Sequence, residues 1–253
     1  MRAAAVAALV IALVAPAPAL AQPINPPPLI APGGIEAARD YALRRAGTVA
    51  FAVAEPGGRI RGLHVNSRFF SASVVKAMLA VAVLRGAADR PLTAHERALL
   101  RPMITVSDNA AASAVYAHVG AAGLYGVAQT AQMTHFRDVG NWADANITAA
   151  DQARLFLHID AMAPKRHRAY LRRLLGSIVP WQRWGIAPVA EARGFHIMFK
   201  GGWRTNISHQ VALLERDGRR FALAVLTRGA GDGYGRLTET GVAARVLAAP
   251  RQR

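Results

Sequence analysis

A serine and a lysine, Ser73 and Lys76, stand three residues apart in a run that predicts a helix. Residues at positions i and i+3 share one face of a helix, so the two side chains can touch. A serine hydroxyl is a weak nucleophile until a base removes its proton, and a desolvated lysine can be that base. The pair therefore predicts acyl-transfer chemistry, and the alternative is an ordinary helix start with an exposed lysine.

Two further polar runs follow Ser73 and Lys76 along the chain. Ser-Asp-Asn occupies 107–109 at a predicted helix start, and Lys-Gly-Gly occupies 200–202 at the end of a predicted strand. Alone, the first run suits a helix N-cap and the second a turn after a strand. Together, in this order, they resemble the Ser-x-x-Lys, Ser-Asp-Asn and Lys-Thr-Gly motifs of class A β-lactamases and penicillin-binding proteins, the penicillin-recognising serine hydrolases. The resemblance runs from about residue 35 to the C-terminus.

The resemblance implies four catalytic residues. Ser73 is similar to the acylated nucleophile, and Lys76 to the residue that activates it, directly or through water. Ser107 would pass a proton to the leaving nitrogen of the substrate. Lys200 would lend positive charge to Ser107 and to the substrate carboxylate.

The resemblance also implies substrate contacts. Asn109 would bind the substrate amide, and Gly202 and Arg204 belong to the predicted binding surface. The oxyanion hole would consist of the backbone N–H groups of Ser73 and Trp203. No metal and no cofactor is expected.

Two departures bear on the reaction. Gly201 stands where the family has Thr or Ser, and one lost hydrogen bond to a charged group costs roughly 1.5–3 kcal/mol. Arg204, Thr205 and Ser208 are the candidates to compensate for it. There is also no Glu between Glu96 and Glu191, although class A enzymes use a loop glutamate there for deacylation. Asp144 is the candidate substitute base, and otherwise it is a solvated loop residue.

The spacing of the motifs and the presence of three tryptophans bear on the shape of the predicted cleft. Ser73 and Ser107 are 34 residues apart (107 − 73), which is shorter than in class A enzymes, so we expect a trimmed helical lobe and an open cleft. Trp181, Trp184 and Trp203 are candidates to line it, although tryptophan is more often a packing residue.

Hydrophobic patterning predicts strands at both ends of the chain and helices between them. The predicted strands are 48–53, 60–65, 195–200, 209–216 and 220–227, and the predicted helices are 35–45, 73–85, 93–103, 108–119, 149–159 and 235–249. The fold class is therefore α+β of the β-lactamase/transpeptidase-like type, with an antiparallel sheet of about five strands and an inserted, shortened helical lobe. One domain spans 35–249, of which 35–70 and 194–249 form the sheet part and 71–193 the helical lobe.

The first residues predict export. An apolar run followed by Ala19-Leu20-Ala21 is typical of a secretory signal peptide spanning 1–21, cleaved after Ala21. A Pro-rich spacer occupies 22–34, and no later run is long enough to predict a transmembrane helix. We expect a secreted, periplasmic or cell-wall-associated protein. The chain contains no cysteine, so its stability depends on a hydrophobic core alone.

The charge of +16 raises the question of a polyanionic partner. The arginines are scattered without interleaved aromatic residues or a nucleic-acid-binding module, so nucleic acid is not the predicted partner. Attraction to anionic cell-wall polymers fits an exported basic protein better. We expect a monomer.

Two functions remain open at this point. The first is a hydrolase acting on β-lactams or on D-alanyl-D-alanine peptides, with slow deacylation because the loop glutamate is absent. The second is a cell-wall-binding protein that keeps the fold and has lost turnover.

Overall fold

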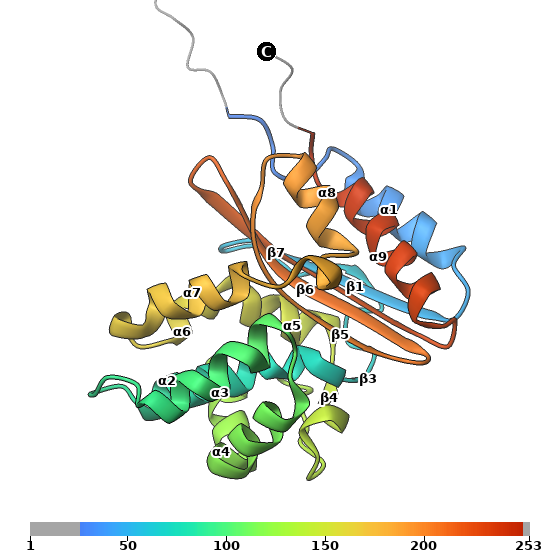
Figure 1. The fold of residues 1–253 in the computed structure, drawn as a ribbon. Coiled ribbons are helices and arrows are strands. Elements are labelled where there is room, and N and C mark those ends of the chain that lie inside the picture. Colours follow the sequence, from blue (N-terminus) through green and yellow to red (C-terminus); the bar gives the residue numbers. More distant parts are fainter. Residues whose placement is uncertain (1–25, 250–253) are drawn as a thin grey trace, which may run out of the picture.

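The centre of the molecule is an antiparallel sheet built from both ends of the chain (Figure 1). A computed structural model describes residues 26–249. The strand order is β2-β1-β7-β6-β5. The strands are β1 (Thr48–Ala54), β2 (Arg61–Leu63), β5 (His196–Arg204), β6 (Ile207–Arg216) and β7 (Arg219–Arg228). The predicted five-stranded sheet and α+β fold are confirmed.

Helices cover both faces of this sheet (Figure 1). One face carries the two terminal helices and a short third one: α1 (Gly34–Leu43), α9 (Asp232–Val246) and α8 (Ile186–Ala192). On the other face α5 (Ala149–Leu157) packs against β1, β6 and β7. The sheet is therefore the middle layer of three, and its apolar strands are buried on both sides.

The remaining helices form a lobe beyond α5. They are α2 (Lys76–Gly86), α3 (Ala94–Thr105), α4 (Asn109–Thr130), α6 (Ile159–Met162) and α7 (Arg168–Gly176). The described residues also form the 3₁₀ turns η1 (Ala72–Val75), η2 (Trp142–Asp144), η3 (Lys165–His167) and η4 (Pro180–Gln182). A two-stranded sheet pairs β3 (Phe69–Phe70) with β4 (Asn146–Ile147), so the loop after α4 lies beside the residues that precede η1.

Capping side chains define two helix starts in this lobe. The Thr93 hydroxyl accepts from the Glu96 N–H and the Glu96 carboxylate accepts from the Thr93 N–H, which is a complete capping box at α3. Thr148 caps α5 by accepting from the Asp151 N–H. Helix α5 has no complete capping box, because the buried Asp151 carboxylate accepts instead from the backbone N–H groups of Thr134 and His135 in the preceding loop.

Several elements differ from the sequence-based expectation. Ser73 lies in the turn η1 and not in the α-helix that begins at Lys76. β5 continues through Arg204, so the Lys-Gly-Gly run lies inside the strand. α4 extends to Thr130 but breaks at Gly120, whose φ of 62° only glycine adopts without strain. α7 and α8 were not predicted, because proline and arginine interrupt the apolar pattern there.

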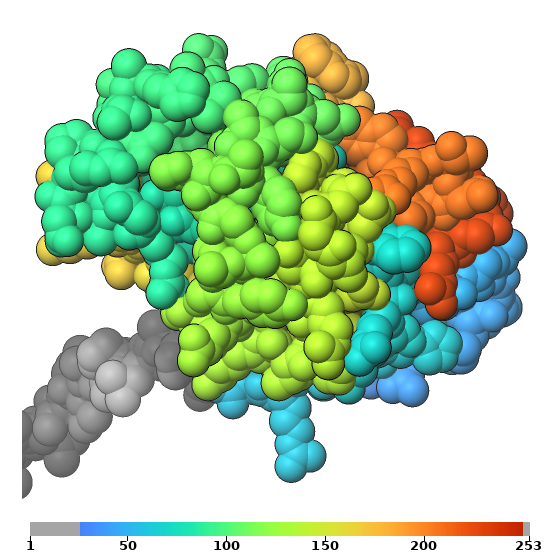
Figure 2. All heavy atoms as spheres, turned by 90° about the horizontal axis from the view of Figure 1, so that it is seen from below, coloured from blue at the N-terminus to red at the C-terminus, as the bar shows by residue number. Residues whose placement is uncertain are grey.

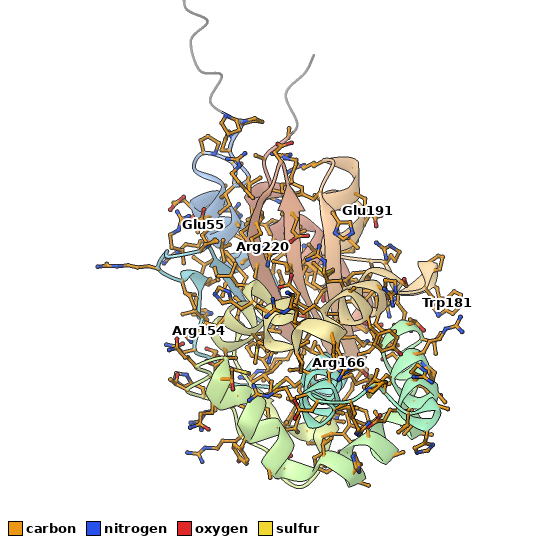
Figure 3. The ribbon with its side chains drawn as sticks, turned by 90° about the vertical axis from the view of Figure 1, so that its left-hand side faces the viewer. Glu55, Arg154, Arg166, Trp181, Glu191 and Arg220 are labelled. Atoms are coloured by element: carbon orange, nitrogen blue, oxygen red, sulfur yellow. The ribbon has the colours of Figure 1, made fainter. Side chains whose placement is uncertain are left out.

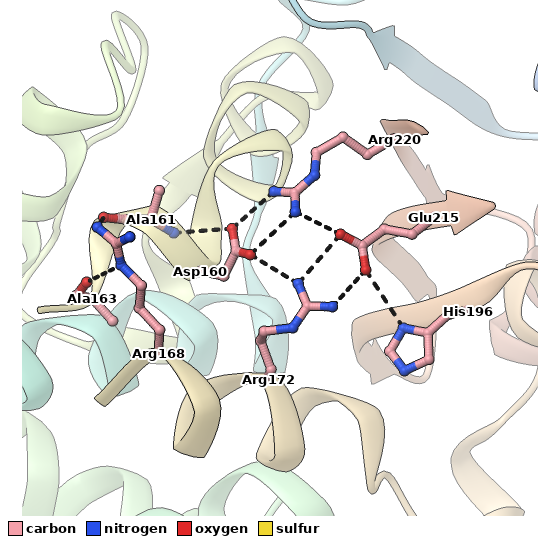
Figure 4. A network of polar contacts seen from close by, with 8 residues as sticks. All are labelled: Asp160, Ala161, Ala163, Arg168, Arg172, His196, Glu215 and Arg220. Carbon is pink, nitrogen blue, oxygen red and sulfur yellow. Dashed lines mark hydrogen bonds and ion pairs between the residues drawn. The ribbon is translucent and has the colours of Figure 1, made fainter. Parts of the chain in front are cut away.

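An ion-pair network joins the helical lobe to the end of the sheet (Figure 4). Asp160 of α6 contacts Arg172 of α7 at 2.8 Å and Arg220 of β7 at 3.0 Å, and Glu215 of β6 contacts the same two arginines at 2.6 and 2.7 Å. Burial alone would raise the pKa of Asp160, but bonding to Arg220 and Arg172 outweighs it and keeps that pKa low. A network of this kind restrains the two parts more than one exposed pair would.

Two predictions concern the ends of the chain. Within residues 26–249, the structure contains no helix with the length and apolar character that a membrane span requires. The predicted signal peptide at 1–21 and the first part of the spacer, 22–25, lie outside the described residues. The predicted division of the domain into a sheet part (35–70 and 194–249) and a helical lobe (71–193) stays a prediction. Helix α8 lies within 71–193 in sequence, but it packs on α9 and β6 of the sheet part.

Candidate active site

The turn η1 presents Ser73 at the edge of β5. The preceding residue, Ala72, has φ 44°, a left-handed conformation uncommon for a residue with a side chain. Gly202 of β5 lies so close that an added Cβ would be 2.8 Å from the backbone nitrogens of Ser73 and Val74. Only glycine fits there, and this close approach fixes the third motif against the predicted nucleophile. Ser73 itself is partly exposed.

Lys76 is fully buried one turn after Ser73 and is hydrogen-bonded to the second motif. Its Nζ donates to the Ser107 carbonyl at 2.6 Å, to the Ser107 Oγ at 3.2 Å and to Asn109 Oδ1 at 2.7 Å. These acceptors satisfy the ammonium in a site that water does not reach. The structure therefore brings the first and second motifs together.

Lys200 approaches the same hydroxyl from β5. Its Nζ donates to Ser107 Oγ at 3.1 Å and to the Gly201 carbonyl at 2.9 Å, and the side chain is fully buried. Ser107 Oγ thus lies between two lysine ammonium groups. Ser107 has φ 61°, a second left-handed residue at the centre of the site. Strain of this kind concentrates at functional sites.

Burial changes the acidity of both lysines. It lowers the pKa of Lys76 to about 8, and the negative charge of Asp108 acts in the opposite direction. Burial, together with the charge of Lys76, holds the pKa of Lys200 well below its usual value. A lysine whose pKa is about 8 is partly neutral near physiological pH, as a general base must be. Asp108 caps α4, accepting from the Ala111 N–H at 2.7 Å.

An indole covers another side of Lys76. The Nζ lies 4.8 Å from the centre of the Trp142 ring, which is a cation–π contact. Trp142 is 9% exposed, and its Nε1 donates to Ser113 Oγ at 3.2 Å. The loop around it is fixed to the nucleophile turn, because the Ser71 N–H donates to the Ala145 carbonyl at 2.8 Å and Ser71 Oγ to the Trp142 carbonyl at 3.0 Å.

The same loop is joined to β5 by an ion pair. Arg204 Nη1 lies 2.6 Å from Asp144 Oδ1, and Arg204 Nη2 donates to the Ala143 carbonyl at 2.8 Å. The other Asp144 oxygen accepts from Asn141 at 2.7 Å. In Figure 2 the yellow-green loop after α4 lies between the green lobe and the orange strands. The predicted substitute base and the predicted carboxylate-binding arginine are thus partners of each other.

Trp184 crowds the position of Gly201 in the third motif. A Cβ added to Gly201 would lie 3.1 Å from Trp184 Cζ2, so a larger residue there would require the indole to shift. Trp203 packs edge-on against Trp184 at 5.0 Å, and the Arg236 guanidinium covers the Trp184 ring at 3.9 Å. Trp184 and Trp203 therefore pack against each other beside β5. Trp181 does not belong to this pair, and 71% of its surface is exposed.

The histidines show no sign of metal chemistry. His209 is fully buried, contacts the Phe70 and Ser208 carbonyls, and has its pKa lowered to about 4 by burial. His196 lies at the exposed start of β5 beside Glu215. Within residues 26–249, no cluster of three or more His, Asp or Glu side chains could hold a metal ion.

Sequence reasoning did not identify Trp142 and Ser113 as parts of the site. Their signal was weak, because they are 29 residues apart and meet only when the loop folds back over α4. A bulky aromatic in the short loop that lacks the expected glutamate was the available hint. The arrangement can lower the pKa of a lysine beside a serine and polarise a second serine, which suits acyl transfer through a serine nucleophile.

This fold and this motif order define a penicillin-recognising serine hydrolase. The model of the beta-lactamase enzyme family matches residues 92–248, and the chain belongs to that family. The matched stretch includes the second and third motifs, while Ser73 and Lys76 precede it. A search of curated proteins gives no match.

Solved structures show the same fold over most of the chain. A beta-lactamase from Sphaerobacter thermophilus superposes with a TM-score of 0.72 at 22% identity, covering 84% of this chain and 95% of that one. PBP-A gives a TM-score of 0.70 at 16% identity, with coverages of 84% and 94%. A point mutant of PBP-A, in an acyl-enzyme complex with penicillin G, gives 0.71 at 18% identity, again with coverages of 84% and 94%.

Proposed function

We propose that this protein is an exported serine hydrolase whose Ser73 is acylated by β-lactams or by D-alanyl-D-alanine peptides, and whose acyl-enzyme is hydrolysed slowly. One observation carries the proposal. The Lys76 ammonium is bonded to Ser107 and Asn109 on one side and faces the Trp142 indole on another. The polar side supports acylation, and the indole side offers nothing that would activate a hydrolytic water.

Acylation follows from the contacts of the two lysines. Neutral Lys76 takes the Ser73 hydroxyl proton while Ser73 Oγ attacks the substrate carbonyl, and the N–H groups of Ser73 and Trp203 stabilise the oxyanion. Ser107 then gives its proton to the leaving nitrogen and recovers one from Lys76, whose Nζ is 3.2 Å from Ser107 Oγ. Lys200, bonded to the same oxygen at 3.1 Å, stabilises negative charge on it.

Substrate orientation rests on groups around β5. Asn109 has a side chain at the mouth of the site, where its amide can bind the substrate amide while its oxygen holds Lys76. Arg204 is the guanidinium nearest in sequence to the altered third motif, and it supplies the charge-assisted contact that Gly201 cannot. Its present partner is Asp144, so a substrate carboxylate at this position competes with an internal one.

Slow deacylation is supported by the carboxylates around the cleft. Asp108 accepts a backbone N–H as the cap of α4, and Asp144 is held by Arg204 and Asn141. We infer that neither acts as the base for hydrolysis. The acyl-enzyme would then outlast the acylation step, because general-base catalysis contributes about 10²–10⁴-fold to such a reaction.

Intact-protein mass spectrometry after penicillin treatment tests this function. We expect a persistent mass increase on the wild type, none on Ser73→Ala, and little turnover of a chromogenic cephalosporin. Rapid turnover of the cephalosporin would contradict the slow-deacylation part. If neither penicillin nor a fluorophosphonate forms an adduct while the protein binds peptidoglycan fragments, the non-catalytic cell-wall-binding alternative is correct.

A further inference from the structure

A cationic surface lies where α3 packs against α7, outside the catalytic group. Three arginines, Arg97, Arg101 and Arg173, act electrostatically on the hydroxyl of one tyrosine, Tyr170. Burial raises the pKa of Tyr170, and the three positive charges oppose that rise. The Arg173 guanidinium lies 5.8 Å from the tyrosine ring centre. We call these four residues the Tyr170 patch.

The patch lacks negative charge to neutralise it. None of its arginines has an ion-pair partner among residues 26–249. Both contributing segments, 97–107 and 161–190, contain no Asp or Glu. Elsewhere on α7 the situation is the opposite, because Arg172 is bonded to both Asp160 and Glu215 (Figure 4). The positive field of the patch is therefore available to a partner.

A surface groove leads from the patch toward the active site. It has a volume of about 430 Å³ and is lined by Arg97, Ala98, Arg101, Pro102, Thr105 and Val106. At 1.5 Å per residue, the lining follows α3 for about 14 Å. It ends at Val106, the residue before Ser107. A polymer chain lying in this groove would therefore end one residue before the second motif in the sequence.

An exposed aromatic residue stands beside the far end of the groove. Gln182 of η4 donates to the Val106 carbonyl at 2.9 Å, which fixes that turn beside Val106. The neighbouring Trp181 is 71% exposed and projects from the surface (Figure 3). An exposed indole offers a flat apolar face with a polar edge, on which a sugar ring can pack.

We propose that the Tyr170 patch and Trp181 form a docking surface for an anionic glycopolymer of the cell envelope, which carries the attached peptide to Ser73. The proposal rests on the proposed function, since it takes the polymer to be part of the substrate's surroundings. Regularly spaced anionic groups would pair with guanidinium groups one helical turn apart on α3 and with the one on α7. Sugar rings would contact Trp181 next to the cleft.

Equilibrium binding of labelled polymers tests the docking surface. The probes are a poly(glycerol phosphate) chain, a sugar-bearing form of the same chain, and a polymer whose charges are carboxylates. The triple variant Arg97→Gln, Arg101→Gln, Arg173→Gln should weaken binding at least about 10-fold and lower the salt slope of log K by roughly two. Trp181→Ala should weaken binding only of probes that contain sugar rings.

A matched control separates this surface from net charge. Arg39, Arg44 and Arg59 are exposed on α1, just after it and on the β1–β2 connection, and they have no ion-pair partner among the described residues. Changing these three to Gln removes the same charge and should alter binding less than about 3-fold. Equal losses in both triple variants would overturn the proposal.

Two further measurements complete the test. If single-stranded DNA binds as tightly as the glycopolymer and loses affinity in the same variants, the surface is a nucleic-acid site and the proposal is wrong. Acylation of Ser73 by soluble penicillin should be unchanged in the triple variant, because its arginines contact none of the catalytic residues. If the wild type forms no adduct, the proposed function fails, whatever the polymers bind.

Discussion

Two sides of the Lys76 ammonium differ in the chemistry that they provide. Toward Ser107 and Asn109 the nitrogen has three hydrogen-bond acceptors within 3.2 Å, and Lys200 shares one of them. Toward the loop after α4 it faces the ring of Trp142. In the proposed function, the first side moves protons between oxygen and nitrogen atoms, and the second offers no group that activates water. The proposal thus separates the groups that form an acyl-enzyme from those that hydrolyse one.

Removing the Lys76 amine should slow acylation of Ser73 strongly. Lys76→Ala is expected to lower the second-order rate of acylation by penicillin about 10³-fold, because Ser73 then loses the amine that takes its proton. Intact-mass kinetics measure this rate. Lys165, an exposed lysine of η3, provides the matched control, and Lys165→Ala should leave the rate unchanged. Residual acylation within about 3-fold of the wild type would show that another group activates Ser73.

Replacing the Trp142 indole by a carboxylate should speed hydrolysis of the acyl-enzyme. Trp142→Glu places a carboxylate beside Lys76, and the release of bound penicillin should then accelerate about 10²-fold. Because Trp142 is buried, thermal unfolding of the variant has to be followed as well. Trp142→Gln has nearly the same shape as the glutamate variant and no basic group, so it should unfold similarly and keep its adduct. Equal acceleration in both variants would mean that opening the space, and not adding a base, is sufficient.

The lowered pKa of Lys76 predicts how acylation depends on pH. Below its pKa of about 8 the amine is protonated and cannot accept the Ser73 proton, so the rate should fall about tenfold per pH unit and level off above pH 8. Asp108→Asn keeps a helix cap but removes the charge that raises this pKa. The inflection of the rate profile should then move to lower pH. An unshifted inflection would assign the titration to another group.

The ion pair of the loop predicts the smallest effect on hydrolysis. Asp144→Asn should change deacylation less than about 3-fold, because the carboxylate serves Arg204 and not a water. It should also speed acylation by penicillin and not by its methyl ester, since the freed guanidinium can bind the substrate carboxylate. A large loss of deacylation would instead make Asp144 the base.

The fold was predictable because its signals are local. Alternating or continuous apolar residues indicate the strands at both ends. In the structure Lys76 and Lys200 both bond to Ser107, and the backbone of Ser73 lies against Gly202. The capping box at Thr93 and Glu96 is a local pattern of the same kind. Helices α7 and α8 were missed, because their stability comes from packing against β5 and α9 and not from a periodic pattern.

The contacts of the loop that carries Trp142 and Asp144 could not be predicted in the same way. Arg204 and Asp144 are 60 positions apart (204 − 144), and no local pattern pairs them. Trp142 contacts Lys76 only because the β3–β4 pairing holds its loop beside η1. Contacts of this kind depend on the whole fold. The sequence therefore shows that a glutamate is missing, but not which residues contact Lys76 and Arg204 in this loop.

The sheet built from both ends of the chain also has a kinetic consequence. β1 pairs with β7 from Thr48↔Arg228 onward, a separation of 180 positions (228 − 48), and Lys200 reaches Ser107 from a strand of the late segment. Contacts between distant segments form slowly because long loops must close first. The neighbours that Ser73 has on β5 are therefore in place only after the late segment of the chain has folded onto the early one. With the proposed function, labelling of Ser73 by penicillin during refolding should then follow completion of the fold.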